Sequence, residues 1–133
     1  MLQLSYDAAT KVVTAITSEE YNTAIAQKQM QEIISFHALQ TDPLEDADLR
    51  VLRIFSEVTF RMTRNEVKEH FAYVQEYLNN THIKKCILAI VTDIPLNTAL
   101  GFLYQSNQTS GSCCYIVKVF STQEAATEWL MIH

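Results

Sequence analysis

Three stretches in the middle of the chain decide its fold class: Leu49-Arg-Val-Leu-Arg-Ile-Phe55, Thr63-Arg-Asn-Glu66 and Cys86-Ile-Leu-Ala-Ile-Val91. The first and the last are predominantly apolar runs, as is typical of strands that are covered on both faces. The middle stretch is a capping box, in which a threonine and a glutamate three residues later stabilise the start of a helix. Apolar residues follow it at helical spacing over residues 67–78. A strand, a helix and a further strand predict a parallel βαβ unit.

Upstream of this unit, the sequence predicts a hairpin and a helix. Residues 2–6 alternate between apolar and polar side chains, and residues 11–17 are predicted to be the returning strand. Thr17 and Glu20 form another capping box, which predicts a helix that begins there and runs to about Ala38.

Downstream, the alternation of strands and helices continues. A short helix is predicted over residues 96–103, just after Pro95, and residues 115–120 are predicted to be the last strand. Ser121 and Glu124 form a third capping box, which predicts a short terminal helix.

The predicted order of elements is therefore ββαβαβαβα. It indicates one layered α/β domain over residues 1–133, with a sheet of four to five mostly parallel strands and an antiparallel hairpin at its N-terminal end.

Composition excludes several classes of function. Gly101 and Gly111 are the two glycines of the chain, and they lie too far apart to form a P-loop, a dinucleotide fingerprint or a nucleophile elbow. The net charge of −5 argues against binding to nucleic acid or to anionic membranes. The sequence shows neither a signal peptide nor an apolar stretch of the roughly 20 residues that cross a bilayer. We therefore expect a cytoplasmic protein without membrane insertion.

The sequence carries no pattern typical of a catalytic or metal site. The three cysteines include no zinc-type pair, and His37, His70 and His82 lack metal-ligand spacing. His70, on the flank of its helix, is expected to be partly buried and hydrogen-bonded. The adjacent Cys113 and Cys114 are expected to pack at the start of the last strand. We expect no enzyme, no metal and no cofactor.

Two stretches resemble the SpoIIAA-like branch of the STAS family. Residues 118–130, Lys-Val-Phe-Ser-Thr-Gln-Glu-Ala-Ala-Thr-Glu-Trp-Leu, are similar to the terminal strand and helix of that family. Residues 52–60, Leu-Arg-Ile-Phe-Ser-Glu-Val-Thr-Phe, are similar to its central strand. The order of elements extends the resemblance over essentially the whole chain. The resemblance implies a non-enzymatic bacterial regulatory module, of which the best-known examples are anti-sigma-factor antagonists.

Those antagonists are switched by phosphorylation of a serine in an Asp-Ser-x-Gly motif, at the start of the helix that follows the central strand. Alignment on residues 58–60 places Thr63 at the serine, Met62 at the aspartate and Asn65 at the glycine. The phosphoserine switch motif of the family is therefore absent.

Two explanations remain open for Thr63. As the N-cap of a helix, it satisfies a free backbone amide. A phosphate on its hydroxyl would lie at the positive end of that helix, beside Arg61 and Arg64. We predict an interaction surface over residues 57–66, with Glu57, Arg61, Thr63 and Arg64 as candidate residues, and a protein partner of unknown identity, with homodimerisation as one form of such contact.

Four aromatic residues indicate an alternative function. Phe102 and Tyr104 lie near the predicted third helix, and Tyr73 and Tyr77 lie off the main apolar stripe of the second. Packing in the core or at its rim is the common role of such residues. They also suit a groove for an apolar ligand, which predicts a small apolar-ligand or lipid carrier as the alternative.

Overall fold

The computed structural model describes residues 2–42, 47–92 and 112–133. Within them, strands form one sheet in the order β1-β2-β3-β4-β5, in which β1 and β2 are antiparallel and all other neighbours are parallel. This is the mostly parallel sheet with an N-terminal hairpin that the sequence predicts. The strands are β1 (Leu2–Asp7), β2 (Val12–Tyr21), β3 (Asp48–Phe60), β4 (Lys85–Val91) and β5 (Cys114–Phe120).

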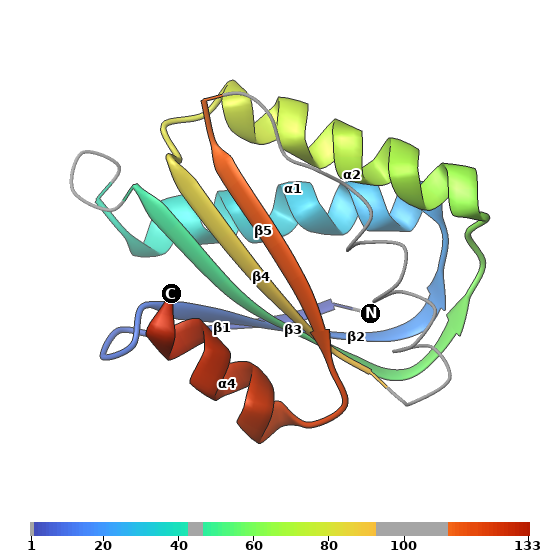
Figure 1. Ribbon diagram of the computed structural model, residues 1–133, viewed down its shortest axis with the longest axis horizontal. Helices are drawn as coiled ribbons and strands as arrows, with labels where there is room; N and C mark the ends of the chain where they lie inside the picture. Colours follow the sequence, from blue (N-terminus) through green and yellow to red (C-terminus); the bar gives the residue numbers. More distant parts are fainter. Residues whose placement is uncertain (1, 43–46, 93–111) are drawn as a thin grey trace.

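The described helices cover both faces of this sheet. They are α1 (Thr23–Gln40), α2 (Arg64–Asn79) and α4 (Gln123–Ile132). Helices α1 and α2 lie side by side on one face, and α4 lies on the other (Figure 1). The helix predicted over residues 96–103 lies outside the described residues. None of the helices described is long and apolar enough to span a bilayer.

The central strand β3 contributes to both hydrophobic cores. Leu49, Val51 and Phe55 belong to the main core beneath α1 and α2. Leu52 belongs to the second core, which α4 closes with Ala126 and Leu130. The prediction that this strand is covered on both faces is confirmed.

The start of α1 differs from the prediction. Thr17 and Glu20 do not cap a helix, because both lie in β2, whose parallel pairing with β3 continues over these residues. The N-cap is Asn22, whose extended backbone (φ −125°, ψ 179°) suits this position. Its side-chain oxygen accepts a hydrogen bond from the backbone N–H of Ile25 at 2.9 Å. The strand pairing therefore overrides a local capping pattern.

The other two helices begin close to the predicted positions. Thr63 caps α2, and the capping box with Glu66 is complete, as predicted. Helix α4 is capped by Thr122 and not by Ser121, so the prediction is wrong by one residue. Thr122 has the extended backbone of an N-cap (φ −129°, ψ 150°), and its hydroxyl accepts from the N–H of Ala125 at 3.3 Å.

The substitution Asn22→Ala tests the observed start of α1. It removes the acceptor for one N–H of the first turn, so we expect the free energy of unfolding to fall by about 1 kcal/mol. Gln40→Ala, at the exposed last position of the same helix, is the matched control and should change little. Urea unfolding followed by circular dichroism measures both. Equal stabilities of the two variants would contradict this cap.

Candidate functional site

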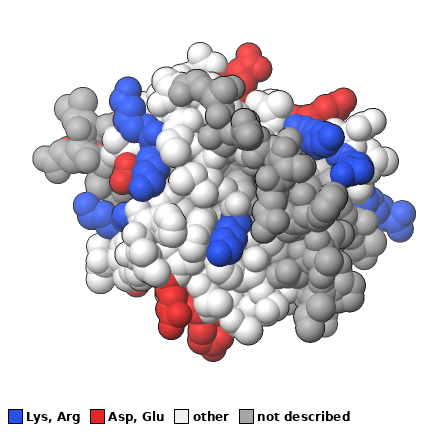
Figure 2. Space-filling model, in the orientation of Figure 1, with Lys and Arg blue, Asp and Glu red and all other residues white. Residues whose placement is uncertain are grey.

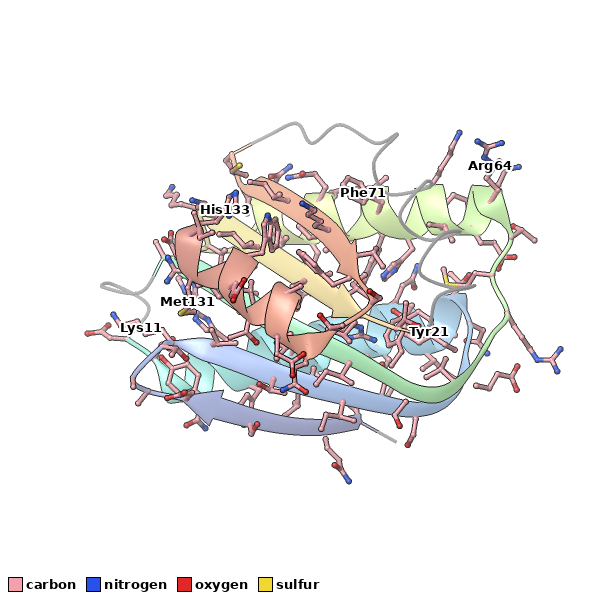
Figure 3. The ribbon with its side chains drawn as sticks, turned by 60° about the horizontal axis from the view of Figure 1, so that its bottom comes forward. Lys11, Tyr21, Arg64, Phe71, Met131 and His133 are labelled. Carbon is pink, nitrogen blue, oxygen red and sulfur yellow. The ribbon has the colours of Figure 1, made fainter. Side chains whose placement is uncertain are left out.

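The start of α2 brings together three of the four residues predicted for an interaction surface. Arg61, Thr63 and Arg64 are all exposed there. In Figure 3 the side chain of Arg64 extends away from the molecule, and Figure 2 shows Lys and Arg side chains over this end. The fourth residue, Glu57, lies in β3, and its side chain is outside the described part of the structure. We call Arg61, Thr63 and Arg64 the α2-start surface.

Hydrogen bonds fix the cap at the centre of this surface. The Thr63 hydroxyl accepts from the backbone N–H of Glu66, and the Glu66 carboxylate accepts from the backbone N–H of Thr63, both at 3.2 Å. The same carboxylate accepts from the Thr23 hydroxyl of α1 at 2.7 Å. The bond from Thr23 and those with Thr63 lower the pKa of Glu66. The carboxylate therefore both caps α2 and ties it to α1.

The ion pair of Arg61 on the α2-start surface contributes little to folding. Arg61 forms an ion pair with Glu20 at 3.4 Å, but these side chains are 65% and 52% exposed, where such pairs add little stability. Arg64 is the first residue of α2, where a positive charge is disfavoured by the helix dipole. The helix dipole therefore does not explain why positive charge gathers at this position.

The predicted aromatic groove is described only in part. Tyr73 and Tyr77 are partly buried on α2 and pack against the main core, with their ring centroids 6.2 Å apart. The Tyr73 hydroxyl accepts a hydrogen bond from the side-chain amide of Gln31 on α1. Phe102 and Tyr104 lie outside the described residues. The described pair therefore contributes to the contact between α1 and α2.

The structure shows a second site that the sequence analysis missed, around Arg53 of β3. Its side chain is only 1% exposed. The guanidinium carbon lies 5.2 Å from the ring centroid of Tyr21 and 5.3 Å from that of Phe55. Its Nη2 donates to Oε1 of Gln29 at 2.5 Å, and this oxygen also accepts from the Thr17 hydroxyl at 2.9 Å. A cation therefore lies inside the main core, held by two rings and one amide.

No negative charge compensates this cation within the described residues. Among the side chains that the structure describes, which do not include those of Glu19 and Glu57, no Asp or Glu forms an ion pair with Arg53, and its Nη1 has no hydrogen-bond partner. Burial raises the pKa of Tyr21 above its usual value, against the lowering effects of the charge of Arg53 and of a hydrogen bond with it. Tyr21 is therefore neutral at physiological pH. Charges buried this deeply are normally paired.

His70 of α2 lies close to this cation. It is 3% exposed, so the expected burial is confirmed, but its Nδ1 has no hydrogen-bond partner among the described residues. Burial, and then the positive charge of Arg53, lower the pKa of His70 to about 4. His70 is therefore a neutral imidazole at physiological pH. We call Arg53, His70, Tyr21 and Gln29 the Arg53 cluster.

One signal in the sequence points to this cluster. Arg53 interrupts the apolar stretch Leu49–Phe55, which is predicted to be covered on both faces. Arg50 interrupts the same stretch near its start and is partly exposed, whereas an arginine in the middle of a strand covered on both faces is a candidate for burial. Its partners on β2, α1 and α2 carry no sequence pattern of their own.

Two of the three cysteines are buried thiols with raised pKa values. Cys113 is buried as expected, whereas Cys114 faces solvent, because successive residues of a strand point to opposite faces. Burial raises the pKa of Cys86, and it raises that of Cys113 to about 11, so both thiols stay protonated at neutral pH. Within the described ranges, no three metal-ligating side chains lie together.

Comparisons with known proteins support the fold. The sequence matches no protein-family model and no curated protein. Its structure is similar to the crystal structure of an uncharacterized protein of the DUF3478 family, with a SpoIIAA-like fold, from Shewanella loihica PV-4. The TM-score is 0.54 at 12% sequence identity, over 98% of this chain and 92% of that chain. The SpoIIAA-like fold implied by the resemblance is therefore confirmed, and this level of identity shows the fold alone.

Replacement of Arg53 by methionine tests whether the buried cation is costly. Methionine has a similar length, and Gln29 keeps its hydrogen bond from Thr17. We expect Arg53→Met to raise the free energy of unfolding by about 1 to 4 kcal/mol, because a desolvated charge is removed. Urea unfolding is the measurement. Lys118→Met, on an exposed position of β5, should stay within about 0.5 kcal/mol of the wild type. A less stable Arg53→Met variant would contradict the interpretation.

The lowered pKa of His70 predicts a pH dependence of stability. Between pH 6.5 and about 4 the unfolded chain binds a proton at His70 that the folded chain does not bind, so stability falls as the pH falls through this window. From pH 6.5 to about pH 5 the loss should be about 1 to 2 kcal/mol. The glutamine in His70→Gln does not titrate. Between pH 6.5 and 5 the unfolding free energy of this variant should therefore fall by about 1 to 2 kcal/mol less than that of the wild type. Parallel profiles of the two proteins would refute this prediction.

Proposed function

We propose that this chain, which has a SpoIIAA-like fold, is a bacterial cytoplasmic regulatory module that acts by protein contact and not by catalysis. The α2-start surface is its contact surface, and the partner presents an acidic segment to it. The observation that carries the proposal is the gathering of exposed positive charge at the positive end of a helix, where the helix dipole disfavours such charge.

The geometry of this surface suits carboxylate groups. Arg61 and Arg64 flank the N-cap, and a planar guanidinium suits bidentate binding of a carboxylate, for which the partner would compete with Glu20 at Arg61. The helix dipole adds positive potential at the same place. Because Glu66 fixes the cap and ties it to α1, the surface is ordered before a partner arrives. An acidic segment therefore binds with little loss of conformational freedom on this side.

The proposed contact needs no phosphorylation of Thr63. Its hydroxyl accepts from the N–H of Glu66, and its own N–H donates to the Glu66 carboxylate. A phosphate on this hydroxyl would disrupt the capping box and face a carboxylate, which like-charge repulsion disfavours. The absence of the Asp-Ser-x-Gly motif agrees with a module that is not controlled at this residue.

The alternative, a carrier for a small apolar molecule or lipid, has weaker support. It rests on a groove that Phe102, Tyr104, Tyr73 and Tyr77 would line. The two tyrosines are engaged in the contact between α1 and α2 and against the main core. Native mass spectrometry of the purified protein tests this alternative, which requires a small molecule that co-purifies in stoichiometric amount.

Charge reversal tests the contact surface. The double variant Arg61→Glu/Arg64→Glu should lose its protein partner, whereas Lys28→Glu/Lys118→Glu, an equal reversal at exposed positions of α1 and β5, should keep it. Affinity capture from the source cells identifies the partner, and calorimetry with the purified partner measures the affinity. We expect a loss of at least about tenfold in the first variant, because the partner's acidic groups then face like charges.

The outcomes of this test are distinct. Arg64→Glu places a negative charge in the first turn of α2, which favours the helix, so a loss of binding does not reflect unfolding. A partner that binds both double variants equally well would refute the surface. If the captured partner is a second copy of the chain, light scattering should show a dimer that only Arg61→Glu/Arg64→Glu dissociates.

A further inference from the structure

The Arg53 cluster holds a charge that no described side chain balances. Arg53 is 1% exposed, and among the side chains that the structure describes neither a carboxylate nor an ionised tyrosine compensates it. The two aromatic rings and the Gln29 amide supply only partial negative charge. A buried charge is costly unless it is paired. The folded chain therefore provides a strong local preference for an anion.

Two buried hydrogen-bonding atoms of the cluster lack partners among the described residues. Nη1 of Arg53 and Nδ1 of His70 are both buried, and neither has a hydrogen-bond partner among the described residues. They come from β3 and α2, and the two residues are close enough for the charge of Arg53 to lower the pKa of His70. Nη1 is a donor, and Nδ1 of a neutral imidazole is a donor in one of its two tautomers. An oxyanion at this position would accept from both.

Arg53 lies in the middle of β3, but two of its neighbours lie near the carboxyl ends of strands. Tyr21 is the last residue of β2, and Arg53 pairs with Ile90, which is one residue before the end of β4. Ligands of open parallel sheets bind at the carboxyl ends of the strands. The register between β2 and β3 also shifts here, because Thr17 pairs with Phe55 and Glu19 with Val58. Such irregularities are frequent beside binding sites.

We propose that Arg53, together with His70, binds the carboxylate group of a small molecule inside the fold. The charge balance selects this group. With His70 and Tyr21 neutral, the cluster carries one positive charge, which one carboxylate neutralises. A phosphate dianion would leave an excess negative charge in the main core, which is costly. The deep burial of Arg53 restricts the bound group to a small one.

This site is separate from the α2-start surface and does not rest on the proposed contact function. Arg53→Met should therefore abolish carboxylate binding and leave the interface residues Arg61 and Arg64 in place. Failure of one proposal does not entail failure of the other, because the two tests use different variants and different ligands.

Acetate is the probe for the test. The full-length protein, exchanged into acetate-free buffer, is titrated with sodium acetate while NMR follows the side-chain Nε–H of Arg53 and the ring of His70. Parallel titrations with chloride and with phosphate at equal ionic strength serve as references. We expect saturable shifts with acetate alone, and the pKa of His70 should rise from about 4, because a bound anion favours the imidazolium.

Three variants make the result specific. Arg53→Met should weaken acetate binding by at least about tenfold, and His70→Phe should weaken it less, because the charge remains. Lys118→Met, an exposed cation on β5, should bind acetate as the wild type does. If Arg53→Met fails to fold, the acetate affinity of His70→Phe decides the question. A weaker affinity indicates binding at the cluster, and an unchanged affinity indicates binding elsewhere.

Several results would overturn the proposal. Shifts that do not saturate, or that persist unchanged in the Arg53→Met and His70→Phe variants, would show that acetate does not bind at the cluster. Saturation by phosphate or chloride without saturation by acetate would assign a different anion and reject the carboxylate. Saturable acetate binding that both variants weaken would support it.

Discussion

Both faces of β3 are covered by helices, and the rest of the structure has to accommodate this constraint. The strand lies in the middle of the sheet, with α1 and α2 over one face and α4 over the other. Side chains at positions 49, 51, 53 and 55 point into the main core, because the side chains of a strand alternate between its faces. Three of these positions are apolar, and the remaining one is Arg53. The architecture that buries the apolar residues therefore also buries a positive charge.

The main core is built around this charge with dipoles. Tyr21 and Phe55 place their rings beside the guanidinium, where the negative faces of the rings attract a cation. The side-chain oxygen of Gln29 accepts a hydrogen bond from Arg53 and a second one from the hydroxyl of Thr17. The contacts come from β2, β3 and α1, so these elements share one polar centre. Their partial charges offset only part of the cost of desolvation, and a negative ligand would supply the remainder.

The sequence predicted the fold better than it predicted the site. Strands and helices followed from apolar periodicity, and the cap at Thr63 followed from a capping box that the structure confirms. Thr17 and Glu20 match the same pattern, yet they lie in β2, because pairing with β3 extends the strand. A capping pattern is local, whereas the length of a strand depends on its neighbour in the sheet. The sequence alone does not show how far β2 pairs with β3.

The site escaped prediction for a related reason. Arginine is almost always exposed. The apolar pattern of the stretch therefore does not predict that the Arg53 side chain is buried. His70 was recognised as a buried residue of α2, but its position beside Arg53 depends on how α2 packs on the sheet. Clusters that gather residues distant in the chain have no spacing that a single sequence can reveal.

Helix α2 connects the two proposed sites. Thr63 at its start and His70 are seven residues apart, which is about 10 Å along a helix. The hydrogen bond from Thr23 to Glu66 ties the start of α2 to α1, which carries Gln29. A carboxylate held between Arg53 and His70 would favour one position of α2 over the sheet, and a protein bound at the α2-start surface would favour one position as well. If the two bound positions of α2 differ, thermodynamic linkage requires that each ligand lowers the binding affinity of the other by the same factor.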